Sequence, residues 1–278
     1  MIEIVEPGPL ASVQDLGRPG WAALGVPRSG AFDRGAARLA NRLVGNDVGA
    51  GVLEVTLGGL AFRALDAVTI ALTGAPCPGL DWGIAVTLRP GTLVRLGTPV
   101  RGLRSYLAAR GGLAVAPELG SCSSDLLSGI GPSPLQRGET LAVGPAPTAS
   151  PSGVAAAPRS GPAEFAIHPG PRVDWFEAGA LDRLTAQPWQ VRTQSDRVGV
   201  RLDGAALRRV RPGELPSEPT LPGAVQVPAD GRPIVFGPDA PVTGGYPVIA
   251  VLTEVALDAA AQVRPGDLVR FRLSSRLR

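Results

Sequence analysis

The sequence contains no lysine, and all 27 of its basic residues are arginine. This absence excludes a Schiff-base lysine, a phosphate-loop lysine and any lysine that could carry covalent biotin or lipoate. There is one histidine, His168, so a site built from several histidines is impossible and a metal ion would need carboxylate ligands. A Ser-His-Asp hydrolase would depend on that residue, but no GxSxG motif surrounds any serine. We predict no metal site.

The chain is also poor in cysteine. Cys77 and Cys122 are the only two, and they form neither a CxxC pair nor a disulfide framework. There is no charged start followed by an apolar stretch, and no apolar run reaches the roughly 18 residues that a membrane span needs. We therefore expect a cytoplasmic protein with no membrane partner.

Concentrated charge is missing as well, because the net charge is +3 and aromatic residues make up 4% of the chain. Nucleic-acid binding needs a basic surface, often with aromatic side chains for base stacking. The largest basic clusters are Arg208, Arg209 and Arg211 and the tail from Arg276 to Arg278. We interpret these short clusters as solvated surface, and we predict no nucleic-acid partner.

What the chain does have is 37 glycines and 29 prolines among 278 residues, with 44% hydrophobic residues. This density of glycine and proline disfavours long helices and is typical of many short strands joined by turns. The hydrophobic content is sufficient for a packed core. The composition predicts a mainly-β protein with a few short helices.

One segment divides the chain. Residues 145–162, PAPTASPSGVAAAPRSGP, contain no leucine, isoleucine or aromatic residue, and we interpret them as an exposed linker between an N-terminal unit (1–144) and a C-terminal unit (163–278). Similar turn-then-strand patterns occur on both sides of it, at Leu88–Gly97, Leu135–Gly144 and Val263–Arg272. They predict two related β-barrel-like units, with chance similarity in a glycine-rich β protein as the alternative.

Periodicity predicts individual elements within these units. The predicted helices are Asp33–Leu43 with Asp33 as its N-cap, Glu254–Gln262 and the more weakly patterned Ala180–Leu184. The predicted strands are Val68–Thr73, Tyr106–Ala109, Gln190–Thr193, Ile234–Phe236 and Val248–Thr253.

Two arginine-bearing segments are candidates for anion binding. Asp15–Gly30 places Arg18 and Arg28 beside glycine and proline, which suits carboxylate or phosphate binding. The alternative is an irregular loop whose arginines pair with Asp15 and Asp33.

The second segment, Ser195–Gly204, carries Ser195, Asp196, Arg197 and Arg201. In an extended run the two arginines would point to the same side, because side-chain direction alternates along a strand. They would then form an anion receptor beside Asp196, which could accept a proton or orient a ligand. An exposed hairpin with an internal Asp–Arg pair is the alternative.

Two further segments could contact a small amide. Gln226 lies between two valines, so it is expected to face away from them, and its amide can both donate to and accept from a lactam or urea. An edge-strand surface position is the alternative. Asp239–Pro247 (DAPVTGGYP) has two glycines that let a ligand approach the backbone, next to the hydroxyls of Thr243 and Tyr246. An ordinary hairpin is the alternative there.

Five stretches of sequence then share a pattern with known proteins. They are Leu24–Asn46, Ser105–Leu113 with Leu119–Asp125, Ser195–Leu202 (SDRVGVRL), Pro222–Val235, and Thr243–Ala250 (TGGYPVIA). Together they resemble the biotin-dependent carboxyltransferase family, which includes the C-subunit of the 5-oxoprolinases, allophanate hydrolase subunit 2 proteins and the antagonist of a sporulation kinase inhibitor. The resemblance runs in order over nearly the whole chain.

This resemblance implies two cyclophilin-like β-barrel units, a partner B-subunit of related fold and a separate A-subunit. It implies an ATP-dependent hydrolysis of 5-oxoproline to glutamate by the assembled subunits, with ATP acting through the complex and this chain inactive alone. Opening the lactam could pass through phosphorylation of the amide oxygen, where Arg197 and Arg201 would stabilise negative charge.

The site residues expected on these grounds fall into two groups. The expected catalytic residues are Asp196, Arg197, Arg201 and Gln226. The expected substrate-binding residues are Arg28, Ser29, Asp33, Ser195, Asp239, Thr243, Gly244, Gly245 and Tyr246. The family commonly has Gln-Thr before Thr-Gly-Gly-Tyr, whereas this chain has Pro241 and Val242, which weakens the transfer of contacts assigned to that loop.

Two alternatives to the hydrolase remain. The chain could be a carboxyltransferase component that receives carboxylate from biotin on another protein and transfers it to a urea- or amide-type substrate. It could instead be a non-catalytic regulatory partner that binds the B-subunit without turnover.

Overall fold

The computed structural model describes residues 1–156 and 163–274, so the end of the predicted linker and the tail Arg276–Arg278 lie outside the described residues. The chain forms two compact units. Unit 1 comprises Met1–Arg18, Ser29–Asp125 and residues 129–156, and unit 2 comprises Pro19–Arg28, Leu126–Ser128 and residues 163–274. Two short segments of the N-terminal half therefore belong to unit 2.

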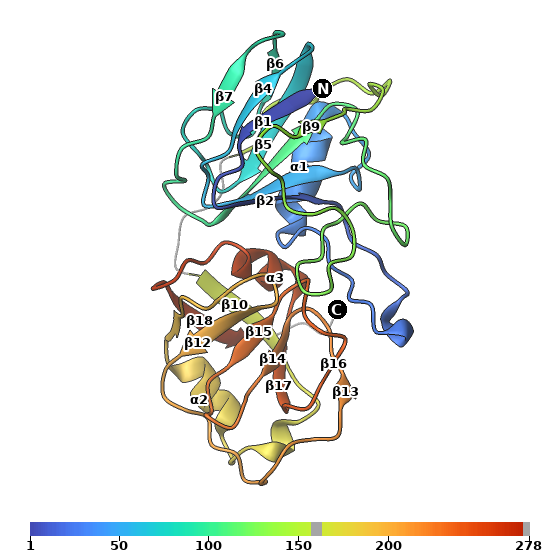
Figure 1. Ribbon diagram of the computed structural model, residues 1–278. Helices are drawn as coiled ribbons and strands as arrows, with labels where there is room; N and C mark the ends of the chain where they lie inside the picture. Colours follow the sequence, from blue (N-terminus) through green and yellow to red (C-terminus); the bar gives the residue numbers. More distant parts are fainter. Residues whose placement is uncertain (157–162, 275–278) are drawn as a thin grey trace. The chain divides into compact units, whose positions relative to one another are not determined.

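Unit 1 is built from two antiparallel sheets (Figure 1). The four-stranded sheet has the order β7 (Leu93–Arg95), β4 (Ala61–Ala64), β1 (Ile2–Glu6) and β9 (Thr140–Leu141). The five-stranded sheet has the order β2 (Leu10–Gln14), β3 (Val52–Thr56), β8 (Arg104–Ala109), β5 (Val68–Gly74) and β6 (Ala85–Leu88).

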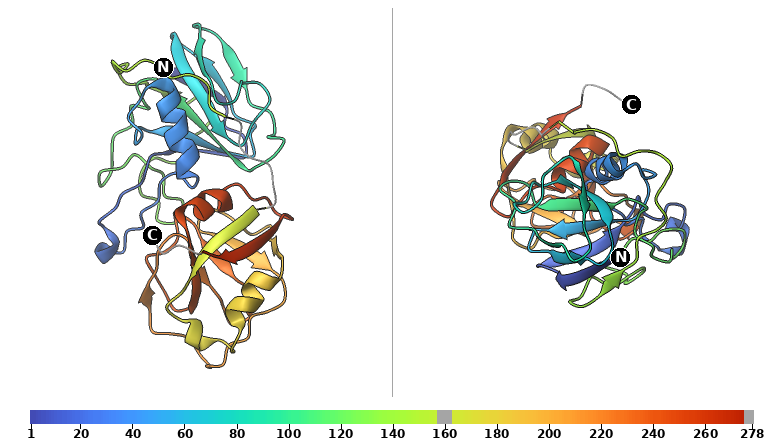
Figure 2. Two further views of the ribbon diagram at one scale, coloured as in Figure 1. Left: turned by 180° about the vertical axis from the view of Figure 1, so that it is seen from behind. Right: turned by 90° about the horizontal axis from the view of Figure 1, so that it is seen from above.

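The core of unit 1 lies between these sheets, where alternate side chains such as Ile4, Phe62 and Leu72 are fully buried. Helix α1 (Arg34–Val44) covers the opposite face of the five-stranded sheet and packs its alanines on β5 and β8 (Figure 2). Asp33 caps this helix, because its side chain accepts a hydrogen bond from Ala36 N–H at 2.8 Å. Both faces of the central strands are therefore covered, which explains their continuous apolar sequences.

A buried network fixes the start of α1 to this sheet. The hydroxyl of Tyr106 donates to Glu54 at 2.8 Å and accepts from Asp33 N–H at 2.7 Å, and Glu54 also accepts from Phe32 N–H at 2.9 Å. Burial, followed by the charges of Glu54 and Asp33, raises the pKa of Tyr106 well above its usual value. The hydroxyl therefore keeps its proton and remains a donor to Glu54.

We expect Tyr106→Phe to destabilise unit 1 by about 1–3 kcal/mol, because the buried Glu54 carboxylate loses one of its donors and the Asp33 N–H loses the hydroxyl oxygen that accepts from it. Urea unfolding measures this loss. The other tyrosine, Tyr246, makes no hydroxyl hydrogen bond among the described residues, so Tyr246→Phe is the matched control and should leave stability nearly unchanged. Equal stability of the two variants would contradict the assigned role of the Tyr106 hydroxyl.

Unit 2 is a closed seven-stranded barrel (Figure 1). Its strands follow the order β10 (Ala163–Pro169), β17 (Val248–Leu252), β14 (Ala224–Gln226), β15 (Ile234–Phe236), β12 (Gly199–Asp203), β11 (Trp189–Val191) and β18 (Leu268–Leu273). The parallel pairing of β10 with β18 closes the barrel. Phe165 and Phe271 are partners on these two adjacent strands, and their rings pack edge to face with centroids 5.8 Å apart.

Short elements surround the barrel. They are helices α2 (Ala180–Ala186) and α3 (Glu254–Ala260), the 3-10 turns η1 (Ala22–Leu24) and η2 (Val173–Trp175), and the two-stranded sheet β13 (Glu218–Pro219) with β16 (Thr243–Gly244). Among the described residues no helix has the length and apolar character to cross a bilayer.

The mainly-β prediction is confirmed, and all three predicted helices are present with ends that differ by no more than two residues. Each predicted strand is also found. The units differ in closure, however, because the described strands of unit 1 form two facing sheets whereas those of unit 2 form a closed barrel. In unit 1 the sheets bury each other's apolar faces, and their outer strands β7, β9, β2 and β6 do not pair with one another.

The described part of the predicted linker is mostly exposed, and it is also anchored to unit 1. Arg110 donates to Pro147 O at 2.6 Å, Ser152 N–H donates to Leu43 O at 3.0 Å, and Ala155 N–H donates to Gly83 O at 2.8 Å. Backbone hydrogen bonds hold this segment, which has no large apolar side chain to bury.

Candidate functional site

Gln226 is the most unusual polar side chain of the barrel. It lies on β14 with 2% of its surface exposed, and its Nε2 has no hydrogen-bond partner among the described residues. A buried amide donor without a partner costs stability, so native proteins rarely retain one without a reason. The predicted alternative, a surface glutamine, is wrong because strands β15 and β17 flank β14 on both sides.

The hairpin Thr243–Tyr246 lies against this amide. A Cβ atom on Gly244 would stand 2.9 Å from Nε2 of Gln226, so the absence of a side chain at 244 leaves room for the amide group. Thr220 completes this side, since its methyl group would lie 3.5 Å from the same Cβ position. The structure therefore places Gly244 next to Gln226, and that these residues form one site stays a prediction.

Arg209 is a residue that the sequence interpretation missed. It was assigned to solvated surface, yet its guanidinium stands 5.8 Å from the ring centroid of Tyr246 and donates to the carbonyl of Val227, next to Gln226. Burial lowers the pKa of Arg209, an effect that the charge of Glu214 partly opposes. It thus places a positive charge beside the ring of Tyr246.

The other two arginines of this cluster are surface residues, as predicted. Arg208 pairs with Glu177 and Arg211 pairs with Asp174, and both arginines are more than half exposed. No regular alternation distinguishes Arg209 from these two, because the segment is not a strand, so the sequence offered no signal for its different environment.

Arg197 and Asp239 form a buried ion pair. Nε and Nη2 of Arg197 each donate to one carboxylate oxygen of Asp239 at 2.8 Å, and the side chains are 1% and 0% exposed. Asp239 also accepts from Leu126 N–H at 3.2 Å. This bidentate pair holds the start of the loop that leads to Thr243–Tyr246, so the geometry gives both residues a positioning role.

The prediction that Arg197 and Arg201 face one cavity is wrong. Arg197 is buried, whereas Arg201 is exposed on β12. The chain bends at Arg197 and Val198, and β12 begins only at Gly199, so the strand alternation assumed for the segment does not apply.

The remaining polar residues of that segment shape the turn. Asp196 accepts from Val198 N–H and Gly199 N–H at 2.8 and 3.0 Å. The hydroxyl of Ser195 accepts from Arg201 N–H at 3.0 Å. Both side chains are therefore engaged in local backbone hydrogen bonds. The internal Asp–Arg pair of the hairpin alternative is not what forms, because Arg197 pairs with Asp239 outside this segment.

The first segment is divided between the two units. Arg28 is exposed in unit 2, whereas Ser29 and Asp33 belong to unit 1. Ser29 donates from its hydroxyl to Ser124 O at 3.0 Å, and Asp33 caps α1. Each of the last two thus has a structural contact within its own unit.

A second polar cluster, around Asp15 in unit 1, was not among the predicted site residues. Its carboxylate accepts from the hydroxyls of Ser121 and Ser123, both at 2.6 Å, and from the N–H groups of Gly17 and Cys122 at 2.7 and 2.9 Å. Burial raises the pKa of Asp15, but these four hydrogen bonds outweigh that effect and leave the pKa below its usual value. Asp15 is therefore ionised at neutral pH.

We expect the thiol of Cys122 to be unreactive near neutral pH. Burial, followed by the charge of Asp15, raises its pKa to about 12. Because thiolate is the reactive form, alkylation of Cys122 in native Cys77→Ala protein at pH 8 should be about a thousandfold slower than that of a free thiol. In the unfolded chain the pKa of this thiol is lower, about 8.5. The contribution of Cys122 to the free energy of unfolding therefore falls as the pH rises above about 8.5. Rapid labelling at pH 8 would contradict this environment.

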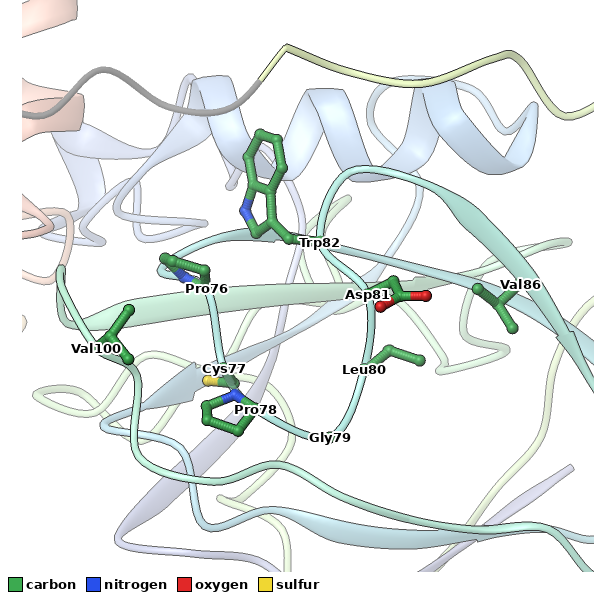
Figure 3. Close-up of a pocket in the computed structure, with 9 residues that line it drawn as sticks. All are labelled: Pro76, Cys77, Pro78, Gly79, Leu80, Asp81, Trp82, Val86 and Val100. Atoms are coloured by element: carbon green, nitrogen blue, oxygen red, sulfur yellow. The ribbon is translucent and has the colours of Figure 1, made fainter.

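A hollow of about 590 Å³ lies elsewhere on unit 1 (Figure 3). Its lining consists of Pro76, Cys77, Pro78, Gly79, Leu80, Asp81, Trp82, Val86 and Val100. None of the predicted site residues lines it. The Trp82 indole N–H is already used, since it donates to Gly74 O at 2.9 Å, and the remaining lining is mainly apolar.

The described residues contain no group of three or more metal-ligating side chains. The N-terminus of α1 does not fit the phosphates of a nucleotide. Asp33 places a carboxylate at the N-terminus of α1, where a phosphate would otherwise bind, and the chain has no lysine. No step of a reaction is therefore assigned to ATP on this chain.

The fold and the site define a mainly-β protein with a closed barrel that carries a cluster of amide and guanidinium groups. Residues 24–273 match the family described as carboxyltransferase domain, subdomain A and B, and the chain belongs to this family. The predicted resemblance is thus confirmed.

Two sequence relatives are similar along nearly their whole length. The chain is 40% identical to the 5-oxoprolinase C-subunit of Escherichia coli, with 98% of this chain and 90% of that protein aligned. It is 33% identical to the 5-oxoprolinase C-subunit of Haemophilus influenzae, with 99% and 92% aligned.

A solved structure shares the fold. The crystal structure of Kluyveromyces lactis urea carboxylase superposes with a TM-score of 0.90 at 29% identity, covering 97% of this chain. This chain corresponds to only 27% of that longer protein.

Proposed function

We propose that this chain is the C-subunit of an ATP-dependent 5-oxoprolinase, which hydrolyses 5-oxo-L-proline to L-glutamate together with a B-subunit of related fold and a separate A-subunit. The observation that carries the proposal is the 40% identity to the Escherichia coli protein over 98% of this chain and 90% of that protein.

The polar groups around Gln226 support a small amide substrate. The Nε2 group of Gln226 is a buried donor without a partner among the described residues, and the carbonyl oxygen of a lactam is a suitable acceptor for it. Arg209 lies against Tyr246 of the neighbouring hairpin, and its positive charge would stabilise the negative charge that develops on the oxygen as the lactam opens. Gly244 and Gly245 let the substrate approach the backbone, and Thr243 and Tyr246 supply hydroxyls at the rim.

The other predicted catalytic residues do not contact the substrate in this proposal. The Arg197–Asp239 pair positions the loop, and Ser195 and Asp196 hold the neighbouring turn. Arg201 is exposed on β12, so it can act only toward a partner protein that covers this face. Full retention of activity by Arg201→Ala in the assembled enzyme would remove it from the reaction.

In this proposal ATP binds to another subunit of the complex. Because the chain has no phosphate-loop lysine and Asp33 occupies the N-terminus of α1, we assign ATP to one of the partner proteins, and the chain alone is proposed to be inactive. Neither cysteine forms a disulfide, which suits a reducing compartment, and we propose a cytoplasmic location.

The test is glutamate release from 5-oxoproline and ATP by this chain purified with the proteins of its neighbouring genes, with each component omitted in turn. Glutamate formation that stops when this chain is left out is the expected result. Activity that survives its omission would instead indicate a regulatory partner of the B-subunit.

The carboxyltransferase alternative is favoured by the description of the matched family and by the structural similarity to the Kluyveromyces lactis urea carboxylase. In that alternative the chain receives carboxylate from biotin on another protein, and Gln226 binds a urea- or amide-type acceptor. It predicts binding to a biotinylated carrier and no need for the A-subunit. Failure of glutamate release by the folded, assembled components together with capture of such a carrier would favour it.

A further inference from the structure

A small sheet without buried residues lies over Gln226. Strands β13 and β16 pair antiparallel, and we call residues 211–222 and 241–246, which contain this sheet, the flap. Every residue of the flap is exposed or half-buried, whereas Gln226 is 2% exposed and Gly244 of the flap lies against its amide. Because the flap contributes no buried apolar side chain, its opening costs less free energy than unfolding of the barrel.

The two segments of the flap are joined to each other. The N–H of Leu215 donates to Gly245 O at 2.9 Å, and the N–H of Thr220 donates to Val242 O at 2.8 Å. These bonds flank the pairing of β13 with β16. The two segments are therefore expected to move together.

Two arginines attach the flap to the rest of unit 2. Arg172 donates from Nε and Nη2 to the two carboxylate oxygens of Glu218, with Nε 3.0 Å from Oε2. Arg209 donates from Nη1 to Gly213 O at 3.1 Å and from Nη2 to the carbonyl of Val227, next to β14. The side chains of Arg172 and Glu218 are 37% and 28% exposed, so water competes with this ion pair. The attachment can therefore break without unfolding the barrel.

The closed flap blocks the donor that the proposed site needs. The Nε2 atom of Gln226 is buried and has no hydrogen-bond partner among the described residues, so a ligand can reach it only if its cover moves. The Cβ position of Gly244 lies 2.9 Å from this nitrogen, and the methyl group of Thr220 lies 3.5 Å from that position. Residues from both segments of the flap thus stand on this side of the amide.

We propose that the flap opens to admit the substrate to Gln226 and then closes over it, with the Arg172–Glu218 pair as its latch. Closure excludes water, and the hydrogen bond from the amide to the substrate oxygen is stronger in a dry site. The identity of the substrate rests on the proposed function, whereas the movement of the flap does not.

Thiol labelling measures the opening without any substrate. Gln226→Cys and Val225→Cys are each made in the full chain with Cys77→Ala, and both are labelled under native conditions. Val225 precedes Gln226 on β14, is 0% exposed and points to the opposite side of the strand, so a thiol there reacts only when the barrel unfolds. We expect the thiol introduced at 226 to react at least about tenfold faster than the one introduced at 225. The Cys77→Ala parent, which keeps Cys122, gives the background rate.

Two results would overturn the proposal. One is an equal labelling rate at 225 and 226, which would show that both positions become accessible only through unfolding. The other is a faster rate at 226 that is fully accounted for by a lower global stability of the Gln226→Cys variant, as measured by urea unfolding.

The latch has a test of its own. Adding Glu218→Gln to the Gln226→Cys variant should speed its labelling about threefold, because a neutral amide holds Arg172 more weakly than a carboxylate does. Asp203→Asn, which breaks the exposed Arg232–Asp203 pair of the same unit, should leave the rate unchanged. A labelling rate that Glu218→Gln does not change would overturn the assignment of the latch.

The assembled enzyme separates this inference from the proposed function. Glu218→Gln should change KM and kcat of glutamate release together, because opening and closing precede and follow the chemical step. Kinetic constants equal to those of the wild type would overturn the role of the latch in the reaction. Wild-type components that release no glutamate would overturn the proposed function alone, since labelling at 226 decides the movement of the flap without substrate.

Discussion

Replacing Asp239 by asparagine is expected to cost about 3–5 kcal/mol of unit 2 stability, because it leaves the guanidinium of Arg197 buried without its counter-ion. The pair is bidentate and almost completely shielded from water, so solvent cannot compensate for the lost charge. Urea unfolding followed by tryptophan fluorescence reports on this unit, since Trp175 and Trp189 are buried in it.

The matched control is the exposed pair Arg232–Asp203, with a nitrogen–oxygen distance of 2.6 Å. Water screens this pair, so Asp203→Asn should change stability little. The double variant Arg197→Met with Asp239→Leu should recover part of the loss, because both buried charges are then gone. An Asp239→Asn protein as stable as the Asp203→Asn protein would show that the buried pair does not hold the loop.

Replacing Gln226 by leucine is expected to reduce the activity of the assembled enzyme about a hundredfold while leaving the stability of the chain unchanged or improved. The activity falls because a donor to the substrate oxygen is lost, which typically costs about 3 kcal/mol of transition-state stabilisation. Stability does not fall because the deleted Nε2 has no partner to lose among the described residues. Steady-state kinetics and thermal unfolding of the same preparation measure the two quantities.

Gln190→Leu is the control, since Gln190 is exposed on β11 of the same barrel. Gly244→Ala provides a second approach, because its Cβ would lie 2.9 Å from Nε2 of Gln226 and would displace the amide without removing it. A Gln226→Leu enzyme with wild-type turnover, or one that loses more than about 2 kcal/mol of stability, would identify Gln226 as a structural residue.

Local sequence signals predicted local structure well. Asp33 before a run of alanines and leucines at helical spacing located α1, because capping and amphipathicity act within one turn of a helix. The glycine-containing turns at Leu88–Gly97 and Val263–Arg272 likewise led into β7 and β18. These signals failed where the chain bends: the alternation assumed for Ser195–Gly204 requires an extended strand, and the bend at Arg197 removes it.

By itself the sequence determined the mainly-β class, the three helices and membership of the carboxyltransferase family, since all of these depend on residue types and short spacings. Only the tertiary structure decided which polar groups meet. Arg197 finds Asp239 42 residues away, and Asp15 finds Ser123 108 residues away. Such contacts depend on which strands and loops become neighbours in the folded units. The unpartnered amide nitrogen of Gln226 became visible for the same reason, because burial and partners are properties of the folded chain and not of the residue type.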